Sequence, residues 1–142
     1  MGFESFGWVS YAGQSRVGQF IDYLKDGKIC ATKCQECGAL QFPPRAHCVR
    51  CLSTNFSWSN LSGNCALMTY TKVDAAPAAF KDQAPYMLGL AELVEGPKIF
   101  AWIDKAVNEN RIALGMKMRV KPKRLSNGNW SYALTEPEHA TA

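Results

Sequence analysis

Four cysteines carry the most defined chemistry in the sequence: Cys34 and Cys37 form one pair, and Cys48 and Cys51 form another. Two intervening residues let a tight turn aim both thiolates at one point, and two such turns complete the tetrahedral sulfur cage that Zn²⁺ accepts. Four protein sulfurs leave no open position for water or substrate, so we expect a structural zinc site. His47 adjoins Cys48 and is an alternative ligand, but the second pair already has the required spacing.

Two further cysteines, Cys30 and Cys65, lie outside this set, and we expect both to be buried, inert thiols. The N-terminal sequence lacks a basic region followed by an apolar core, the pattern of a secretory signal. Six cysteines without such a signal favour metal binding in a reducing compartment over disulfides. We therefore expect a cytoplasmic protein, and no apolar run is long enough to predict a transmembrane helix.

A second group of charged side chains lies in residues 116–124, where basic and apolar residues alternate. The strand that this alternation predicts would carry its basic residues on one face. They are Lys117, Arg119, Lys121, Lys123 and Arg124. The face is either a solvated strand surface or an anion-binding surface for coenzyme A phosphates or a nucleic-acid backbone. Nucleic-acid binding would also need aromatic platforms for the bases. The candidates are Tyr70, Tyr86, Phe100, Trp102, Trp130 and Tyr132.

Arg45 is a second anion candidate, on the proline-containing loop between the two cysteine pairs. Its alternative role is a hydrogen bond to carbonyl groups of the same loop. The sequence has no Gly-x-Ser-x-Gly, no His-Glu-x-x-His and no convincing carboxylate pair. We therefore expect no catalysis by this chain alone. Four thiolates would lower the net charge of +4 by four and one Zn²⁺ would add two, and the resulting charge of about +2 does not require a nucleic-acid partner.

The elements that position these groups follow from hydrophobic periodicity. Apolar residues at i, i+3, i+4 and i+7 predict a helix over residues 14–26, with Ser15 as N-cap and Gly27 at its end. A short strand over residues 28–33 leads into the first cysteine pair. Strands are then predicted over residues 65–73, 86–95, 98–104, 116–124 and 130–134. Their number and spacing fit a five-stranded OB barrel, although an SH3-like barrel has similar propensities.

Residues 1–13 form an aromatic arm without clear periodicity, containing Phe3, Phe6, Trp8 and Tyr11. The arm either folds back over its own domain or docks on another subunit, since exposed aromatic surface usually marks an interface. Within the predicted strands, Gly89 is a candidate β-bulge. Residues 98–104 are apolar at successive positions, which predicts a strand buried on both faces.

The order of these segments resembles the DUF35 family over roughly residues 14–124. The resemblance rests on Cys-x-x-Cys-Gly, then Phe-Pro-Pro-Arg, then Cys-x-x-Cys, with further support from the Glu-Gly-Pro corner at residues 95–97. It implies an α+β chain with an N-terminal helix, a rubredoxin-like zinc ribbon and an OB-fold barrel. Cys65 departs from the glycine frequent at this position in the family. We divide the chain into an arm and helix, a ribbon, a barrel and a frayed tail over residues 1–29, 30–56, 57–136 and 137–142.

The resemblance also implies a role, because DUF35 proteins are accessory partners of thiolase-superfamily enzymes in acyl-CoA metabolism. We expect a hetero-oligomer in which the partner supplies the catalytic cysteine and the oxyanion hole. Coenzyme A would bind at the subunit boundary, with phosphate contacts from Arg45, Lys117, Arg119 and Lys121. The alternative function is single-stranded nucleic-acid binding by the barrel.

Overall fold

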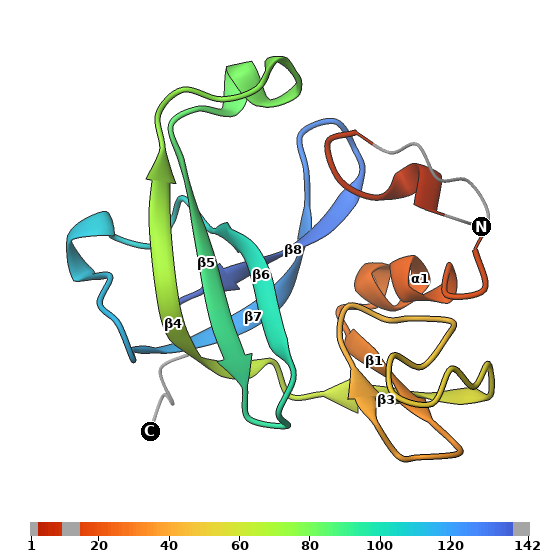
Figure 1. The fold of residues 1–142 in the computed structure, drawn as a ribbon. Helices are drawn as coiled ribbons and strands as arrows, with labels where there is room; N and C mark the ends of the chain where they lie inside the picture. The colour runs from red at the N-terminus through yellow and green to blue at the C-terminus, as the bar shows by residue number, and fades with distance from the viewer. Residues whose placement is uncertain (1–2, 10–14, 138–142) are drawn as a thin grey trace.

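The computed structural model describes residues 3–9 and 15–137, and it contains a small three-stranded sheet followed by a closed five-stranded barrel (Figure 1). The first part comprises η1 (Phe3–Ser5), α1 (Gln19–Lys25), β1 (Ile29–Cys34), β2 (Leu40–Gln41) and β3 (Phe56–Leu61). The second part comprises β4 (Asn64–Val73), η2 (Ala78–Gln83), β5 (Tyr86–Leu93), β6 (Lys98–Ile103), η3 (Glu109–Arg111), β7 (Lys117–Arg124) and β8 (Trp130–Thr135). The predicted α+β class is confirmed.

The barrel has the strand order β4-β5-β6-β8-β7, and β7 returns to pair with β4. All its ladders are antiparallel except the one between β6 and β8, where Trp102 pairs with Ala133 and Ile103 with Leu134. This closure is the OB arrangement and resolves the choice between OB and SH3-like barrels. The smaller sheet has the order β2-β1-β3 and is antiparallel throughout. Because β3 reaches Leu61, this sheet includes residues that our expected division assigned to the barrel.

Helix α1 is shorter than the sequence pattern predicts, and residue 14 lies outside the described residues. Its apolar stripe is nevertheless as expected, with Phe20, Ile21 and Leu24 at most 1% exposed. Ser15 is not the N-cap of the helix; its Oγ accepts a hydrogen bond from the Val17 N–H at 3.3 Å in the turn that precedes α1. Gly27 follows the helix with a φ of 81°, as its predicted stop position requires.

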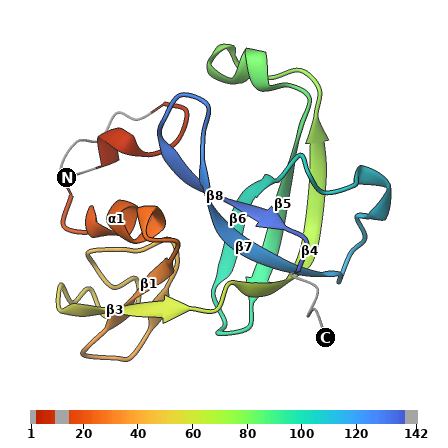
Figure 2. The same cartoon turned by 180° about the vertical axis from the view of Figure 1, so that it is seen from behind.

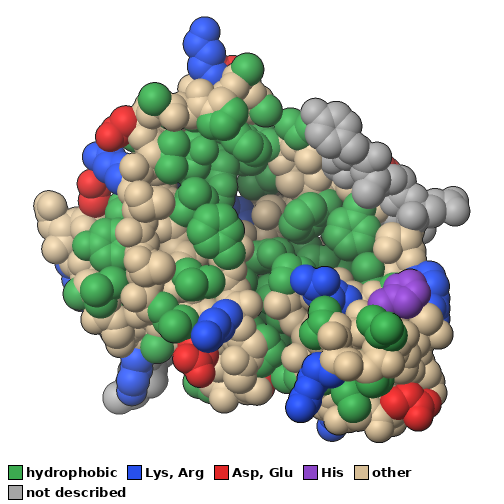
Figure 3. All heavy atoms as spheres, viewed as in Figure 1, with side chains coloured by type: hydrophobic (Ala, Val, Ile, Leu, Met, Phe, Trp, Pro, Cys, Tyr) green, Lys and Arg blue, Asp and Glu red, His purple; other side chains and the backbone are tan. Residues whose placement is uncertain are grey.

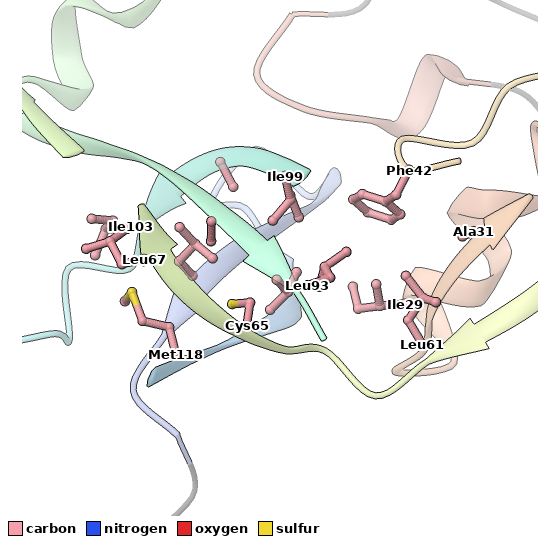
Figure 4. Close-up of a cluster of buried hydrophobic side chains, with 14 of the residues drawn as sticks. Ile29, Ala31, Phe42, Leu61, Cys65, Leu67, Leu93, Ile99, Ile103 and Met118 are labelled. Atoms are coloured by element: carbon pink, nitrogen blue, oxygen red, sulfur yellow. The ribbon is translucent and has the colours of Figure 1, made fainter. Parts of the chain in front are cut away.

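One continuous cluster of buried side chains joins α1, the small sheet and the barrel. Figure 4 shows Phe42 and Ile29, from the part with the cysteine pairs, facing Ile99 and Leu93 of the barrel. Helix α1 lies beside the barrel and contacts both β1 and β8 (Figure 2). The two sheets therefore share one core, and the orientation of the ribbon on the barrel is fixed by side-chain packing.

The described part of the N-terminal arm folds back over its own chain. Phe3 and Phe6 pack against the core, and the Gly7 N–H donates to the Trp130 carbonyl at 2.8 Å. Trp8 lies 6.2 Å from Trp102, measured between ring centroids. These contacts favour the first of the two expectations for the arm. Tyr11 lies outside the described residues, as does the tail beyond residue 137 with His139.

Two strand expectations are corrected. β6 is not buried on both faces, because Phe100 points outward and is 62% exposed while Ile99 and Ala101 point inward. The β-bulge lies in β4 between Leu67 and Thr69 rather than at Gly89. A Cβ on Gly89 would lie 2.8 Å from Leu134 Cδ1, so this glycine serves packing inside the barrel.

Candidate metal centre and surrounding surface

The four cysteines predicted as zinc ligands lie together, although ten residues separate the two pairs. All four Sγ atoms are within 4.8 Å of one another, with 3.5 Å between Cys34 and Cys51 and 3.5 Å between Cys37 and Cys48. A tetrahedral Zn²⁺ site with Zn–S bonds of about 2.3 Å has sulfur–sulfur edges of about 3.8 Å. The donor set and its spacing therefore fit zinc.

Both cysteine turns have the same backbone pattern. In the first, the Cys34 N–H donates to the Ala39 carbonyl at 2.9 Å, and the Gly38 N–H donates to the Cys34 carbonyl at 3.0 Å. In the second, the Cys48 N–H and the Leu52 N–H make the equivalent bonds, at 2.9 Å to the Ser53 carbonyl and 3.0 Å to the Cys48 carbonyl. The turns are thus local structures that each aim two thiols at the centre.

The fifth residue of each turn adopts a positive φ, which is 77° at Gly38 and 63° at Leu52. Glycine tolerates this conformation without strain, as predicted for Gly38, whereas leucine rarely adopts it. Leu52 is also 76% exposed, so burial does not explain its presence. Leu52 follows Cys51 as Gly38 follows Cys37, and this equivalent spacing could have predicted a positive φ at Leu52 from the sequence.

Backbone N–H groups favour the thiolate form in the cluster, although neighbouring thiols and burial raise the pKa values of Cys37 and Cys51. The N–H groups of Cys51 and Arg50 lower the pKa of the Cys48 thiol to about 6, and the Arg50 N–H lies 3.3 Å from its sulfur. The N–H groups of Cys37 and Glu36 likewise lower the pKa of Cys34. Thiolate is the form that binds metal. With four thiolates around it, a zinc ion here would have no position for substrate, so its role is structural.

The remaining sulfur and imidazole candidates stay outside the cluster. His47 is exposed and is not among the clustered ligands. Cys30 and Cys65 are 3% and 4% exposed, as predicted for inert thiols, and burial raises the pKa of Cys65 to about 11. Cys65 lies inside β4, paired with Met118 and Leu93, so its departure from the family glycine leaves the preceding turn intact.

The anion candidates of the sequence separate into different places. Arg119 and Lys121 line a groove of about 540 Å³ between α1 and β7, where Lys25 and Lys28 join them. Lys117 is exposed at the start of β7 and is not among the groove residues. Arg45 is exposed on the ribbon loop, where its backbone N–H donates to Thr32 Oγ1 at 3.0 Å. Lys25, on α1, and Lys28, between α1 and β1, were not identified from the sequence, because both are distant in sequence from β7.

The other two basic residues of β7 belong to a second cavity. Lys123 and Arg124 line a space of about 420 Å³ with Asp104, and Lys123 Nζ lies 3.0 Å from Asp104 Oδ2. Two of the predicted base-stacking rings are already stacked on each other there, since Tyr86 and Trp102 have centroids 4.3 Å apart and an interplanar angle of 6°. Their mutual stacking gives less support to the nucleic-acid alternative.

Among the described residues, no helix is both long enough and apolar enough to cross a membrane.

The fold and the cysteine centre together define a class of protein, a structural zinc ribbon joined to an OB-fold barrel. Family models agree with both parts: the ChsH2 rubredoxin-like zinc ribbon domain matches residues 22–57, and the ChsH2 C-terminal OB-fold domain matches residues 58–122. The chain belongs to the DUF35 family, as its motifs predict.

Two curated relatives are described as DUF35 domain-containing scaffold proteins. The protein of Methanocaldococcus jannaschii is 34% identical over 98 residues, which cover 68% of this chain and 69% of the relative. The protein of Pyrococcus furiosus is 32% identical over 98 residues, which cover 69% of this chain and 71% of the relative.

Two solved structures have the same fold. A chain described as the Ltp2-ChsH2(DUF35) aldolase superposes with a TM-score of 0.73 at 19% identity, covering 90% of this chain and 98% of that one. A DUF35 protein of unknown function from Sulfolobus solfataricus superposes with a TM-score of 0.59 at 21% identity, covering 92% and 90%. At these identities the likeness concerns the fold.

Proposed function

We propose that this chain is a non-catalytic, zinc-stabilised accessory subunit of a thiolase-type enzyme that acts on acyl-CoA or 3-oxoacyl-CoA thioesters. The observation that carries the proposal is membership of the DUF35 family, whose two relatives above are described as scaffold proteins. The partner would supply the cysteine nucleophile, the acid and base groups and the oxyanion hole. We place the complex in the cytoplasm, where thiols stay reduced.

The chemistry of the described residues supports a helper rather than a catalyst. The four cysteines form a closed cage, which provides no site for a reacting group. The pKa of Asp104 lies below its usual value because, although burial opposes it, the Ala106 N–H and Lys123 stabilise the carboxylate. A general acid would need the opposite shift.

An exposed apolar surface supports association with a partner. Phe100 is 62% exposed on the outer face of β6, and the half-buried Leu90 is its neighbour on β5. Figure 3 shows hydrophobic side chains gathered on this side of the barrel. Exposed apolar surface of this kind usually marks an interface.

The basic groove supports a contact with coenzyme A phosphates at the subunit boundary. Arg119 and Lys121 were the sequence candidates, and the groove adds Lys25 and Lys28. Arginine holds phosphate oxygens with a planar fork, and lysine adds compact charge. Arg45 and Lys117 remain candidate contacts at separate positions on the surface. In the assembled enzyme, Arg119→Gln with Lys121→Gln should raise the KM for the thioester, whereas Lys98→Gln on β6 is the control.

The proposal is tested by co-expressing this chain with the thiolase-type subunit whose gene lies nearest to its own in the genome. We expect the two chains to co-purify as a hetero-oligomer and the complex, but not this chain alone, to cleave a 3-oxoacyl-CoA thioester. Phe100→Asp should weaken assembly while leaving the zinc content of the isolated chain unchanged. Turnover by this chain alone, or failure of the two chains to associate, would contradict the proposal.

The substrate is a finer question within the same proposal. One candidate role is the small subunit of benzoylsuccinyl-CoA thiolase in anaerobic toluene degradation. The co-purified complex should then cleave benzoylsuccinyl-CoA in preference to acetoacetyl-CoA, and a comparison of the two kcat/KM values decides the point. The opposite preference would assign the complex to another thioester.

A further inference from the structure

The cavity of about 420 Å³ beside β6 has no role in the proposed function. Three parts of the fold enclose it: the N-terminal segment with Trp8, the η2 segment with Phe80, and the β7–β8 hairpin with Leu125. Figure 3 shows a hollow in this region, with hydrophobic side chains around it. Its volume falls in the range of small-molecule sites, about 300–1,000 Å³.

Aromatic rings form the walls, and they are held in place by one another. Trp102 stacks on Tyr86, and Phe80 meets Trp102 edge-on at 5.7 Å between centroids. Trp8 lies at 6.2 Å from Trp102. The Trp8 segment is itself fixed, because the Asn129 side chain donates to the Gly7 carbonyl at 3.1 Å. A ligand would therefore enter a preformed site and would not have to order its walls.

The charges of the cavity favour a negatively charged ligand. Its lining contains three cations, Lys105, Lys123 and Arg124, and one carboxylate, Asp104. Asp104 already accepts from Lys123 Nζ at 3.0 Å and from the Ala106 N–H at 2.9 Å. The lining therefore carries an excess positive charge of two, which an anionic ligand would complement.

We propose that this cavity binds a small planar aromatic carboxylate, with its ring among Trp8, Phe80 and Trp102 and its carboxylate directed to Lys123 and Arg124. Flat rings pack well on aromatic walls, and a carboxylate accepts charge-assisted hydrogen bonds from lysine and arginine. The site is made by this chain alone. Its existence does not depend on the proposed enzyme partner, and the loss of one proposal would leave the other intact.

Nuclear magnetic resonance titration of the zinc-loaded full chain tests the proposal with three probes of similar shape. They are 2-naphthoate, the neutral 2-naphthamide and the dianionic 2-naphthyl phosphate. We expect saturable shifts of the Trp8 and Trp102 indole N–H signals with 2-naphthoate, while the Trp58 indole in β3 is unchanged. The neutral amide should bind at least about fivefold more weakly, which corresponds to about 1 kcal/mol, whereas the phosphate, an anion with the same ring, should shift the same indole signals.

Variants separate the contribution of the ring from that of the charge. Lys123→Gln should weaken 2-naphthoate binding about tenfold but leave 2-naphthamide binding nearly unchanged. Phe80→Ala should weaken both probes, and because Phe80 is half-buried on η2 and lies outside the main core cluster, the variant should still fold. Lys117→Gln removes the same charge from the same strand outside the cavity and is the matched control. Zinc content and signal dispersion verify that each variant folds.

Three outcomes would overturn the proposal. One is equal affinity for 2-naphthoate and 2-naphthamide, which would remove the role of charge. Another is a set of shifted signals around the basic groove at Arg119 instead of the aromatic walls. The third is 2-naphthoate binding that is unchanged in both Lys123→Gln and Phe80→Ala.

Discussion

The zinc ribbon and the barrel lie side by side, but different forces hold them. In the barrel, closed ladders surround Leu67, Ile99 and Leu134, whose side chains are at most 1% exposed. In the ribbon, β2 has only two residues, and Cys37 and Cys51 are exposed. Metal coordination supplies the energy that a small apolar core cannot, so the two regions should respond to different perturbations.

The shared core limits how independent the two regions can be. Phe42 and Ile29 belong to the same buried cluster as Leu93 and Ile99 of the barrel. Loss of the metal should therefore loosen one side of the barrel, even though its strands remain paired. The predictions that follow distinguish these contributions, from the largest expected effect to the smallest.

Replacement of a zinc ligand should have the largest effect. Cys37→Ser should abolish zinc binding and unfold the ribbon, because structural zinc contributes about 10–16 kcal/mol of apparent binding energy in zinc-finger peptides. Elemental analysis measures the metal, and NMR spectra follow the two regions separately. Cys30→Ala, at a buried thiol outside the cluster, is the control that should keep zinc. Retention of zinc with an unchanged melting curve in Cys37→Ser would show that the cage does not support the ribbon.

A cavity in the barrel should destabilise the protein without displacing the metal. Leu67 is 1% exposed, so Leu67→Ala should cost about 2–5 kcal/mol of unfolding free energy. Leu114 is 66% exposed, and the control variant Leu114→Ala should change the unfolding free energy by about 0.5 kcal/mol or less. Urea unfolding measures both values. Loss of zinc from folded Leu67→Ala would mean that the ribbon depends on the barrel more than we infer.

Overpacking the barrel should have a smaller effect. In Gly89→Ala the added Cβ would lie 2.8 Å from Leu134 Cδ1 and 3.0 Å from Leu67 Cδ1. We expect a loss of about 1–3 kcal/mol, because these side chains must leave their preferred rotamers. The midpoint of urea unfolding reports the loss. An unchanged or raised midpoint would show that space exists here for a methyl group.

The ion pair between Lys123 and Asp104 at the aromatic cavity should contribute least to the free energy of unfolding. Asp104 is only partly buried, so Asp104→Asn should cost about 1 kcal/mol or less. Its lowered folded-state pKa means that the contribution is present above the usual carboxyl value of 3.8 and is lost as the pH falls through the lower folded value. The stability difference between wild type and Asp104→Asn, measured from pH 7 to pH 2, should therefore shrink at the acid end. A constant difference would exclude this linkage.

Local rules predicted most of the architecture and the metal centre. The cysteine spacing specified two turns, and coordination chemistry required them to meet, so no long-range information was needed. Strict alternation located β7, and its apolar residues Met118 and Val120 do face inward at 1% and 2% exposure. The OB topology needed the family resemblance, because strand propensities alone do not order strands in a barrel.

Features that depend on long-range packing were not predictable in the same way. The outward direction of Phe100 is set by the pairing of β6 with β5, and its sequence neighbours are all apolar. Lys25 and Lys28 line the same groove as Arg119 only because α1 packs beside β7. The packing role of Gly89 likewise requires knowledge of the opposite wall of the barrel.

The pairing of residues near the start of the chain with the last strand has a consequence for protein synthesis. Phe6 forms a parallel bridge with Trp130, and β8 closes the barrel between β6 and β7. A growing polypeptide on the ribosome exposes the ribbon, complete at Leu61, long before Trp130 emerges. We expect the nascent chain to bind its metal early, whereas residues 3–9 can pack in their final position only after β8 has been synthesised.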